Sequence, residues 1–327
     1  MSVMSPPRRP AAVARAHAFT TYDASFARVL GNVPRLVRVV DVDAHEGPVY
    51  APLEDALYVT SVPSDDGVAI RRIALDGERW DLPTERVSTV PARTTRANGM
   101  TAGPDGSLLV CEQGDLVHPA RISRVETRTA SATVYVDNWQ GRPLNSPNDV
   151  VLARDGALWF TDPSYGHLQG FRPHPAVGDF VCRLGADGSL RVVDDSFDKP
   201  NGIALSPDQQ VLYVTDSGAN QEPGSFHPDR PHHVVAFDIT GTGHLTHRRL
   251  LAVIAPGFPD GLKVDAAGRI YVSSAAGVEV LSPDGAPLGR INLPGAVNFT
   301  FGGPGNNVLF ITADTAVWAA VLDTQGA

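Results

Sequence analysis

The stretch from Ser146 to Asp162, SPNDVVLARDGALWFTD, decides the fold that this sequence predicts. It begins with three polar or turn-forming residues, PND, and continues as a short apolar strand, VVL. A turn at Asp155 and Gly156 then leads into a second apolar strand, LWF. An aspartate–glycine pair between two apolar runs is a strong signal for a β-hairpin. The stretch therefore predicts a strand–turn–strand unit that is headed by polar residues.

The same pattern recurs along the chain at a nearly regular spacing. The further copies are EGPVYAPLEDALYVTS (46–61), NGMTAGPDGSLLVC (98–111), NGIALSPDQQVLYVTD (201–216), DGLKVDAAGRIYVSS (260–274) and NFTFGGPGNNVLFIT (298–312). The residues that head the six units are separated by 52, 50, 53, 59 and 38 positions. A repeat of about 50 residues built from short strands is typical of a β-propeller, in which each repeat forms one four-stranded blade. We therefore predict an all-β fold, a six-bladed β-propeller.

The two ends of the chain are expected to close this ring together. After Asn298 the sequence has room for about three strands of common length. The apolar segment LVRVVDV (36–42) supplies a fourth, so blade six would contain strands from both ends of the chain. Such closure leaves no open sheet edge in the ring. We predict that residues 1–18, rich in proline, arginine and alanine, form a disordered N-terminal arm, and that residues 19–327 form a single propeller.

Bulk composition argues against several classes of function. The 327-residue chain has a formal net charge of −9 and a sequence pI near 5.5, which argues against nucleic acid and anionic membrane surfaces as partners. No apolar run reaches the roughly 18 residues of a spanning helix, and the basic N-terminus lacks the apolar core of a secretory signal. Cys111 and Cys182 lie in apolar segments and are expected to be buried free thiols. We predict a cytoplasmic protein whose partner is a small molecule; the sequence leaves its oligomeric state open.

The residues that head the six units, here called the heading residues, suggest a metal site. Corresponding positions of successive blades converge on the central channel of a propeller. One asparagine–glycine or aspartate–glycine pair would indicate only a turn, but here a polar residue occupies the same position in every repeat. Oxygen donors favour a hard cation, Ca²⁺ ahead of Mg²⁺, whereas zinc prefers histidine or cysteine. The heading residues are Glu46, Asn98, Asn148, Asn201, Asp260 and Asn298.

Seven segments in this order resemble the gluconolactonase/regucalcin-like (senescence marker protein) family of six-bladed, calcium-dependent lactonases. They are EGPVY (46–50), NSPNDVV (145–151), WFTDPSYG (159–166), KPNGIALSPD (199–208), LYVTDSG (212–218), PDGLKVDAAGRIYV (259–272) and NFTFGGP (298–304). The resemblance implies one divalent cation, Ca²⁺ ahead of Mg²⁺, Mn²⁺ or Zn²⁺. It implies metal ligation by Glu46, Asn148 and Asp260, with Asn201 as a fourth oxygen donor. Arg96 and Asn98 match an Arg-x-Asn pair that contacts substrate in some members.

This resemblance predicts metal-dependent hydrolysis of a lactone to the hydroxy acid. A divalent cation polarises the carbonyl group and stabilises the oxyanion that develops on it. Asp260 is the candidate base, acting on the attacking water either directly or through a metal-bound water. Arg96 and Asn98 would orient the substrate.

One departure from the family pattern leaves the substrate open. Many gluconolactonases read Cys-Glu-His-Gly-x-Arg-Arg where this chain reads CEQGDL (111–116), so the basic pair is missing. Another hydrolase on the same scaffold, such as a phosphotriesterase-like or natural-product tailoring enzyme, is therefore an alternative. A second alternative is a non-catalytic binding propeller with a structural ion.

Two long loops are expected to be functional, since long loops in a compact fold usually are. They cover residues 163–177 and 217–232, and Tyr165, Phe171 and Phe226 are candidate pocket walls. The histidines of these loops are expected to have surface or lid roles.

Overall fold

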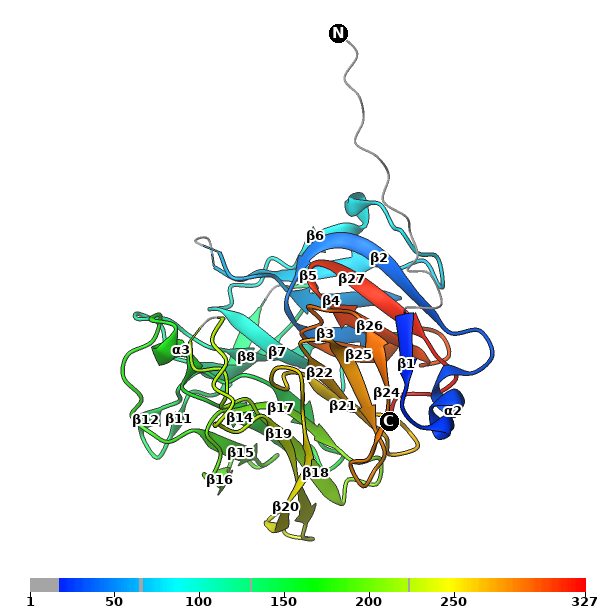
Figure 1. Cartoon of the computed structure of the whole chain (residues 1–327). Helices are drawn as coiled ribbons and strands as arrows, with labels where there is room; N and C mark the ends of the chain where they lie inside the picture. The colour runs from blue at the N-terminus through cyan, green and yellow to red at the C-terminus, as the bar shows by residue number, and fades with distance from the viewer. Residues whose placement is uncertain (1–17, 65–66, 130, 223) are drawn as a thin grey trace.

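The structure of this protein is a computed structural model. It describes residues 18–64, 67–129, 131–222 and 224–327 (Figure 1). The predicted disordered arm lies outside these residues, except for Ala18, which is buried. The predicted six-bladed β-propeller is confirmed, because the long strands form six antiparallel sheets with the first strands of the six repeats in contact around the axis.

The first three blades are each a four-stranded sheet in simple sequence order. Each strand pairs antiparallel with the next strand along the chain, although the connection between them is long where it contains a helical turn. Blade one contains β3 (Glu46–Ala51), β4 (Ala56–Thr60), β5 (Ile70–Ala74) and β6 (Val87–Thr89). Blade two contains β7 (Ala97–Ala102), β8 (Leu108–Glu112), β9 (Arg121–Val125) and β10 (Ala132–Val136). Blade three contains β13 (Val150–Leu152), β14 (Leu158–Asp162), β15 (Phe180–Leu184) and β16 (Leu190–Asp194).

Blades four to six continue the ring. Blade four is β17 (Pro200–Leu205), β18 (Val211–Asp216), β19 (His233–Ile239) and β20 (Leu245–Val253), and blade five contains β21 (Leu262–Val264), β22 (Ile270–Ser274), β23 (Gly277–Leu281) and β24 (Pro287–Asn292). Blade six contains β25 (Phe299–Gly302), β26 (Val308–Thr312) and β27 (Asp314–Val321). Outside the blades lie the small hairpin β11 (Asn138–Trp139) and β12 (Arg142–Pro143), and four helical turns, η1 (Ala24–Phe26), α2 (Ala27–Leu30), η2 (Thr84–Arg86) and α3 (Tyr165–Leu168).

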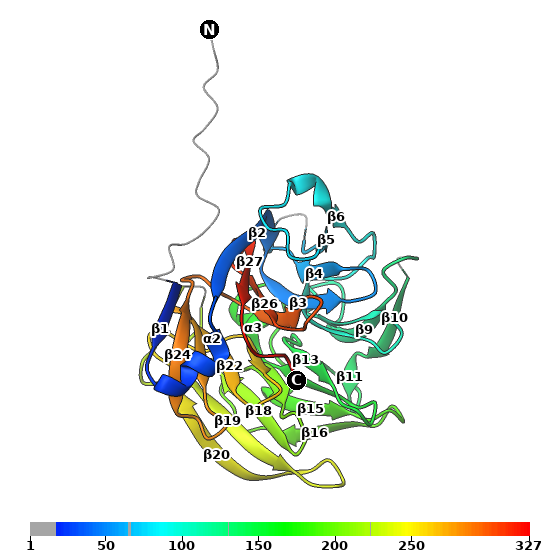
Figure 2. The same cartoon turned by 90° about the vertical axis from the view of Figure 1, so that its right-hand side faces the viewer.

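Blade six is closed by both ends of the chain, as the sequence predicts. Its outer strand is β2 (Arg35–Ala44), which pairs antiparallel with β27, with Leu36 opposite Ala320. Figures 1 and 2 show the blue and red strands side by side. The sheet order β2-β27-β26-β25 therefore joins the first long strand to the last three.

The segment 19–30, which has no clear pattern in the sequence, adds a fifth strand to blade five. β1 (Phe19–Thr21) pairs with β24, with Phe19 opposite Ile291. The helical turns that follow place Phe26 against Gly289, where an added Cβ would lie 2.3 Å from the Phe26 ring. The first described residues thus cover the outer edge of this blade.

Side chains from one strand fill two interfaces between blades, because they alternate across the strand. In β14, Phe160 joins the apolar cluster that contains Leu109 of blade two, whereas Trp159 joins the cluster that contains Leu212 of blade four. Cys111 and Cys182 are buried in the first of these clusters as free thiols, which confirms the prediction for both.

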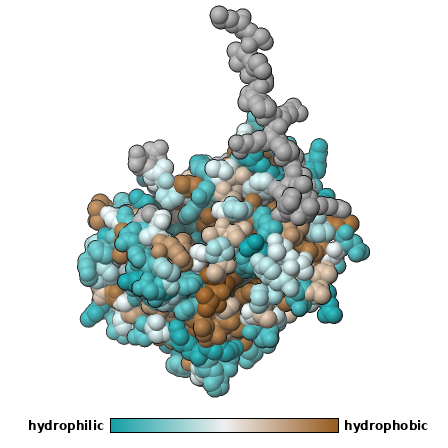
Figure 3. Space-filling view, viewed as in Figure 1, coloured by the Kyte–Doolittle hydropathy of each residue, from teal (hydrophilic) through white to brown (hydrophobic). Residues whose placement is uncertain are grey.

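On the face in Figure 3, hydrophilic residues surround a central group of hydrophobic ones. Among the described residues, no helix has the length and apolar character needed to cross a membrane.

Candidate active site

The heading residues lie where the first strand of each blade begins, and glycine lets neighbouring blades approach there. Gly99 donates its N–H to the carbonyl oxygen of Asn148 over 2.8 Å, and an added Cβ would lie 2.3 Å from that oxygen. At Gly202 an added Cβ would lie 2.4 Å from the carbonyl oxygen of Asp260. The glycines in these pairs are therefore required by close packing between blades. The turn that such pairs indicate in isolation is not formed.

The ring of heading residues is closed by a side-chain contact between the last repeat and the first. The Asn298 amide donates to Glu46 Oε2 over 2.7 Å, and its oxygen accepts the N–H of Phe299. Asn298 is 1% exposed and Glu46 is 4% exposed. Asn298 thus holds the Glu46 carboxylate in place, and the two hydrogen bonds occupy its own amide.

Threonine hydroxyls connect several heading positions to the next blade. Thr161 donates to the carbonyl oxygen of Asn201 over 2.7 Å, and Thr215 donates to that of Asp260 over 3.0 Å. Thr312 donates in the same way to His45, next to Glu46, over 2.7 Å. These threonines occupy the same place near the end of the second strand of their blades. The repeated letters FTD, VTD and FIT were the available signal for them in the sequence.

An acidic residue directly after this position holds the loop that precedes a heading asparagine. Asp162 accepts the N–H groups of Asn145 and Ser146, both over 2.9 Å. Asp216 accepts those of Asp198 and Lys199 over 3.0 and 2.9 Å. Each carboxylate therefore fixes the backbone about three residues before the heading residue, Asn148 or Asn201.

Glu112 does the same in blade two. It accepts the N–H of Thr95 over 2.6 Å, three residues before Asn98, and pairs with Arg121. We call Glu112, Asp162 and Asp216 the acidic clamps. Sequence reasoning missed their role, because an acid at a strand end does not by itself show which amide it binds.

The Asp162 carboxyl is fully buried, and this changes its titration. Burial raises its pKa to about 7, while the hydrogen bonds from the backbone of Asn145 and Ser146 oppose the shift. Asp162 is therefore a clamp whose charge depends on pH near neutrality.

Two carboxylates, the buried Glu46 and the partly exposed Asp260, lie close enough for their charges to interact. Burial and then the charge of Glu46 raise the pKa of Asp260 well above its ordinary value. Burial also raises the pKa of Glu46, which His45 opposes. Two like charges in a buried place need a nearby cation or a proton.

Neutral oxygens complete a donor set that fits a divalent cation. Asn148 Oδ1 is buried and has no hydrogen-bond partner within the described ranges. Asn201 is 5% exposed, and hydrogen bonding from its side chain lowers the pKa of Asp260. No group of three or more His, Cys, Asp or Glu side chains suited to a metal occurs in the part of the chain that the structure describes. The chemistry is thus that of two carboxylates with amides, which suits a hard cation rather than zinc.

The two residues expected to contact substrate lie next to this ring. Asn98 Oδ1 is buried without a hydrogen-bond partner in the described structure. The Arg96 guanidinium lies over the Phe171 ring, 4.4 Å from its centroid. Arg96 also has a positive φ of 52°, an uncommon conformation for a side chain of this size.

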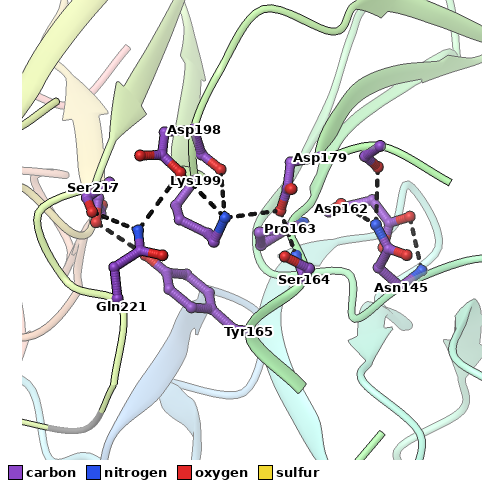
Figure 4. Close-up of polar contacts among 12 residues, drawn as sticks. Asn145, Asp162, Pro163, Ser164, Tyr165, Asp179, Asp198, Lys199, Ser217 and Gln221 are labelled. Carbon is purple, nitrogen blue, oxygen red and sulfur yellow. Dashed lines mark hydrogen bonds and ion pairs between the residues drawn. The ribbon is translucent and has the colours of Figure 1, made fainter. Parts of the chain in front are cut away.

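The two long loops meet where Tyr165 lies beside Ser217 and Gln221 (Figure 4). The Tyr165 hydroxyl of α3 donates to the carbonyl oxygen of Ser217 over 3.4 Å. Ser217 Oγ in turn donates to the carbonyl oxygen of Pro259 over 2.5 Å. Burial and then the charge of Asp260 raise the pKa of Tyr165 well above its ordinary value. Tyr165 therefore lies close enough to Asp260 for the two groups to interact.

A buried lysine joins the same loops. Lys199 Nζ lies 3.2 Å from Asp198 Oδ1 and 3.5 Å from Asp179 Oδ1 (Figure 4). Asp179 also accepts the N–H of Ser164, next to Tyr165, over 2.5 Å. Phe226 differs from Tyr165, since it is 47% exposed and packs against His232.

This fold and site define a class of protein: a six-bladed propeller with carboxylate and amide oxygens at one end of its channel. The chain belongs to the SMP-30/gluconolactonase/LRE-like family, whose model matches residues 44–315.

Similar proteins include several lactonases by name. A gluconolactonase from Zymomonas mobilis is 32% identical, with 86% of this chain and 79% of that protein covered. The pentonolactonase XacC from Haloferax volcanii is 29% identical, with 85% and 84% covered. The solved structure of a gluconolactonase from Xanthomonas campestris is 33% identical, with a TM-score of 0.77 and 97% and 99% covered. The calcium-binding protein regucalcin from Agrobacterium tumefaciens is 18% identical, covers 88% and 92%, has a TM-score of 0.65 and shares the fold.

Proposed function

We propose that this protein is a metal-dependent lactonase that hydrolyses a cyclic ester to its hydroxy acid. The observation that carries the proposal is the set of heading residues in which the charges of Glu46 and Asp260 interact and the buried Asn148 oxygen has no partner among the described residues. The similarity to gluconolactonases and a pentonolactonase over most of the chain supports the same chemistry.

Glu46, Asn148, Asn201 and Asp260 would hold one divalent cation, Ca²⁺ ahead of Mg²⁺, Mn²⁺ or Zn²⁺. When bound, such a cation supplies Lewis-acid polarisation of the lactone carbonyl. The donors fit this group because two acids of like charge would otherwise interact unfavourably and a buried amide oxygen would have no partner.

Asp260 is the base of the proposed reaction. It takes a proton from the attacking water as the water oxygen bonds to the carbonyl carbon. The ring C–O bond then breaks, and the leaving oxygen takes up a proton to become the hydroxyl of the product. Without a cation, burial and then the charge of Glu46 raise the pKa of Asp260, and a ligated cation would oppose that shift.

Arg96 and Asn98 orient the substrate. The unpartnered Asn98 oxygen accepts a hydrogen bond from a substrate hydroxyl, and Arg96 donates to substrate oxygens. The loop after β8 presents Leu116 and Val117, 70% and 83% exposed, where many family members have the basic pair. This replacement favours lactones that carry an apolar substituent as well as sugar lactones.

Acid release from lactones tests the proposal. Chelator-treated protein is assayed by pH change on glucono-δ-lactone, a pentonolactone and an alkyl-substituted δ-lactone, with each cation added back separately and spontaneous hydrolysis subtracted. We expect turnover that requires the cation and is abolished in Asp260→Asn. Turnover of phosphotriesters alone would indicate another hydrolase. Cation binding that raises the melting temperature with no turnover would indicate a binding propeller with a structural ion.

A further inference from the structure

Arg172 is a buried cation that binds backbone and no acid. It is 8% exposed, and its Nε donates to the carbonyl oxygen of Asn145 over 2.9 Å. Nη2 donates to the carbonyl oxygen of Leu144 over 3.1 Å. Nη1 donates to the carbonyl oxygens of Asp115 and His118 over 2.7 and 3.1 Å. It makes no ion pair with a carboxylate in the described ranges. A guanidinium that makes four such bonds fixes the segments it contacts, because its donors have a rigid planar geometry.

The segments that Arg172 joins all lead to the candidate site. Asn145 lies three residues before Asn148 and is held by the clamp Asp162. The loop after β8 contacts the backbone beside the predicted substrate residues, since Gln113 donates its N–H to the carbonyl oxygen of Arg96 over 3.0 Å. Arg172 therefore connects the loop 163–177 to two loops that carry site residues.

Phe171, the residue before it, is placed under the Arg96 side chain. The N–H groups of Phe171 and Arg172 both bond to the carbonyl oxygen of Gly166 over 2.9 Å. An added Cβ at Gly166 would lie 2.2 Å from Arg172 Cγ and 2.9 Å from the Phe171 ring, so the chain is closely packed here. The ring is held by this packing, and the Arg96 guanidinium lies over it.

We propose that Phe171 and Arg172 are positioning residues for Arg96: the aromatic face holds the guanidinium in place, and Arg172 fixes the loop that presents this face. The inference rests on the proposed lactonase function for its kinetic readout. Stacking uses the face of the guanidinium and leaves the N–H groups at its edge for substrate oxygens. Apart from this stack, the Arg96 guanidinium has no hydrogen bond or ion pair in the parts of the chain that the structure describes.

Holding Arg96 in place before binding lowers the entropic cost of substrate binding, since a long side chain is already ordered. Loss of the stack should therefore raise KM and leave kcat and cation affinity unchanged. A cation–π contact of ordinary strength corresponds to a rise in KM of about threefold to tenfold.

The test compares Phe171→Leu with Phe171→Tyr, which keeps an aromatic face, and with Phe226→Leu, a change at the exposed aromatic residue of the other long loop. We expect a higher KM only in Phe171→Leu, with kcat and the Kd for Ca²⁺ as in the unchanged protein. Equal KM in all three variants, or an equal fall of kcat in Phe171→Leu and Phe171→Tyr, would overturn the proposal.

A second measurement does not depend on turnover. Phenylglyoxal labels accessible arginines, and peptide mass spectrometry reports labelling of Arg96 relative to the exposed Arg93 in the same segment. Arg96 should be labelled several times faster in Phe171→Leu and in Arg172→Lys, because the lysine cannot make the four bonds. Unchanged labelling in both variants would also overturn the proposal. If the unchanged protein shows no lactone turnover but Arg96 is labelled faster in the two variants, the result would count against the lactonase function and support the positioning role.

Discussion

Blades two, three and four differ from blades one, five and six in where they carry negative charge. In the first group the heading residue is an asparagine, and the acidic clamp of the same blade is Glu112, Asp162 or Asp216. In the second group the corresponding position is neutral, as Ser61, Ser274 or Ala313. The two carboxylate heading residues, Glu46 and Asp260, both belong to this second group.

At the heading and clamp positions, no blade carries two acids. Blades one and five carry a carboxylate at the heading position, blades two to four carry one at the clamp position, where it binds backbone N–H groups, and blade six carries none at either. Buried like charges destabilise a fold unless each has its own partner. The distribution therefore separates acids for the candidate metal from acids that hold the loops.

The largest expected effect comes from making blade five resemble blades two to four. In Asp260→Asn we expect lactone turnover to fall at least about a hundredfold, because the base is removed. Without cation the variant should melt at a higher temperature than the unchanged protein, since the neutral asparagine avoids the cost that burial and the charge of Glu46 impose on Asp260. Scanning fluorimetry with and without Ca²⁺ measures both, and a variant destabilised in chelator would contradict this account.

The reverse change adds a second acid to a blade that already has one. Ser61 is 4% exposed, and its hydroxyl accepts the N–H of Ala69 over 3.0 Å. Ser61→Asp should lower the free energy of unfolding by about 3 kcal/mol at pH 7, because the new charge is buried near Glu46 without a cationic partner. Ser61→Asn is the matched neutral control, and denaturant unfolding compares the two. Equal losses in both variants would assign the effect to size rather than charge.

Removing a clamp sharpens the comparison through pH. The folded-state pKa of Asp162 is raised to about 7, above its unfolded value, so between about pH 4 and pH 7 the folded protein holds a proton that the unfolded chain has released. This group therefore makes stability fall by about 1.4 kcal/mol per pH unit as pH rises through that range. Asp162→Asn should flatten the pH dependence of unfolding free energy measured in chelator. An unchanged slope would show that Asp162 does not titrate there.

The smallest effect is expected at a feature that both groups of blades share. Thr161 accepts the N–H of Asp149 over 3.1 Å and donates to Asn201 over 2.7 Å, both in buried surroundings. Thr161→Val should cost about 2 kcal/mol of unfolding free energy, since two buried groups lose their partner. Thr161→Ser keeps the hydroxyl and is the control. If it loses as much unfolding free energy as Thr161→Val, the effect would come from packing instead of hydrogen bonding.

Much of the architecture could be predicted from the sequence because the repeat is strong. The alternating strands, the turns such as Asp155-Gly156 and the regular heading positions are local signals, and six copies reinforce one another. The closure by 36–42 followed from counting strands after Asn298. The heading residues meet in space because the fold repeats, so their convergence could also be foreseen.

The remaining features depend on partners far away in the chain. β1 has only three residues, and its pairing with β24 gives no periodic signal. Local rules indicate a turn at Asn98-Gly99, because they cannot represent the neighbouring blade that requires the glycine. The acidic clamps and the contact between Arg96 and Phe171 likewise depend on loops that the sequence does not place relative to each other.

The contact that completes the ring joins residues 252 positions apart, Glu46 and Asn298. During synthesis, the first candidate ligand leaves the ribosome long before its partner exists, and β2 has no strand to pair with until β27 emerges. Folding along the growing chain can build blades one to five in turn, but the candidate site waits for the last. A chain interrupted before Asn298 would therefore hold the strands of blades one to five and lack the contact that fixes Glu46. Assembly of the site thus waits for the segment that begins blade six.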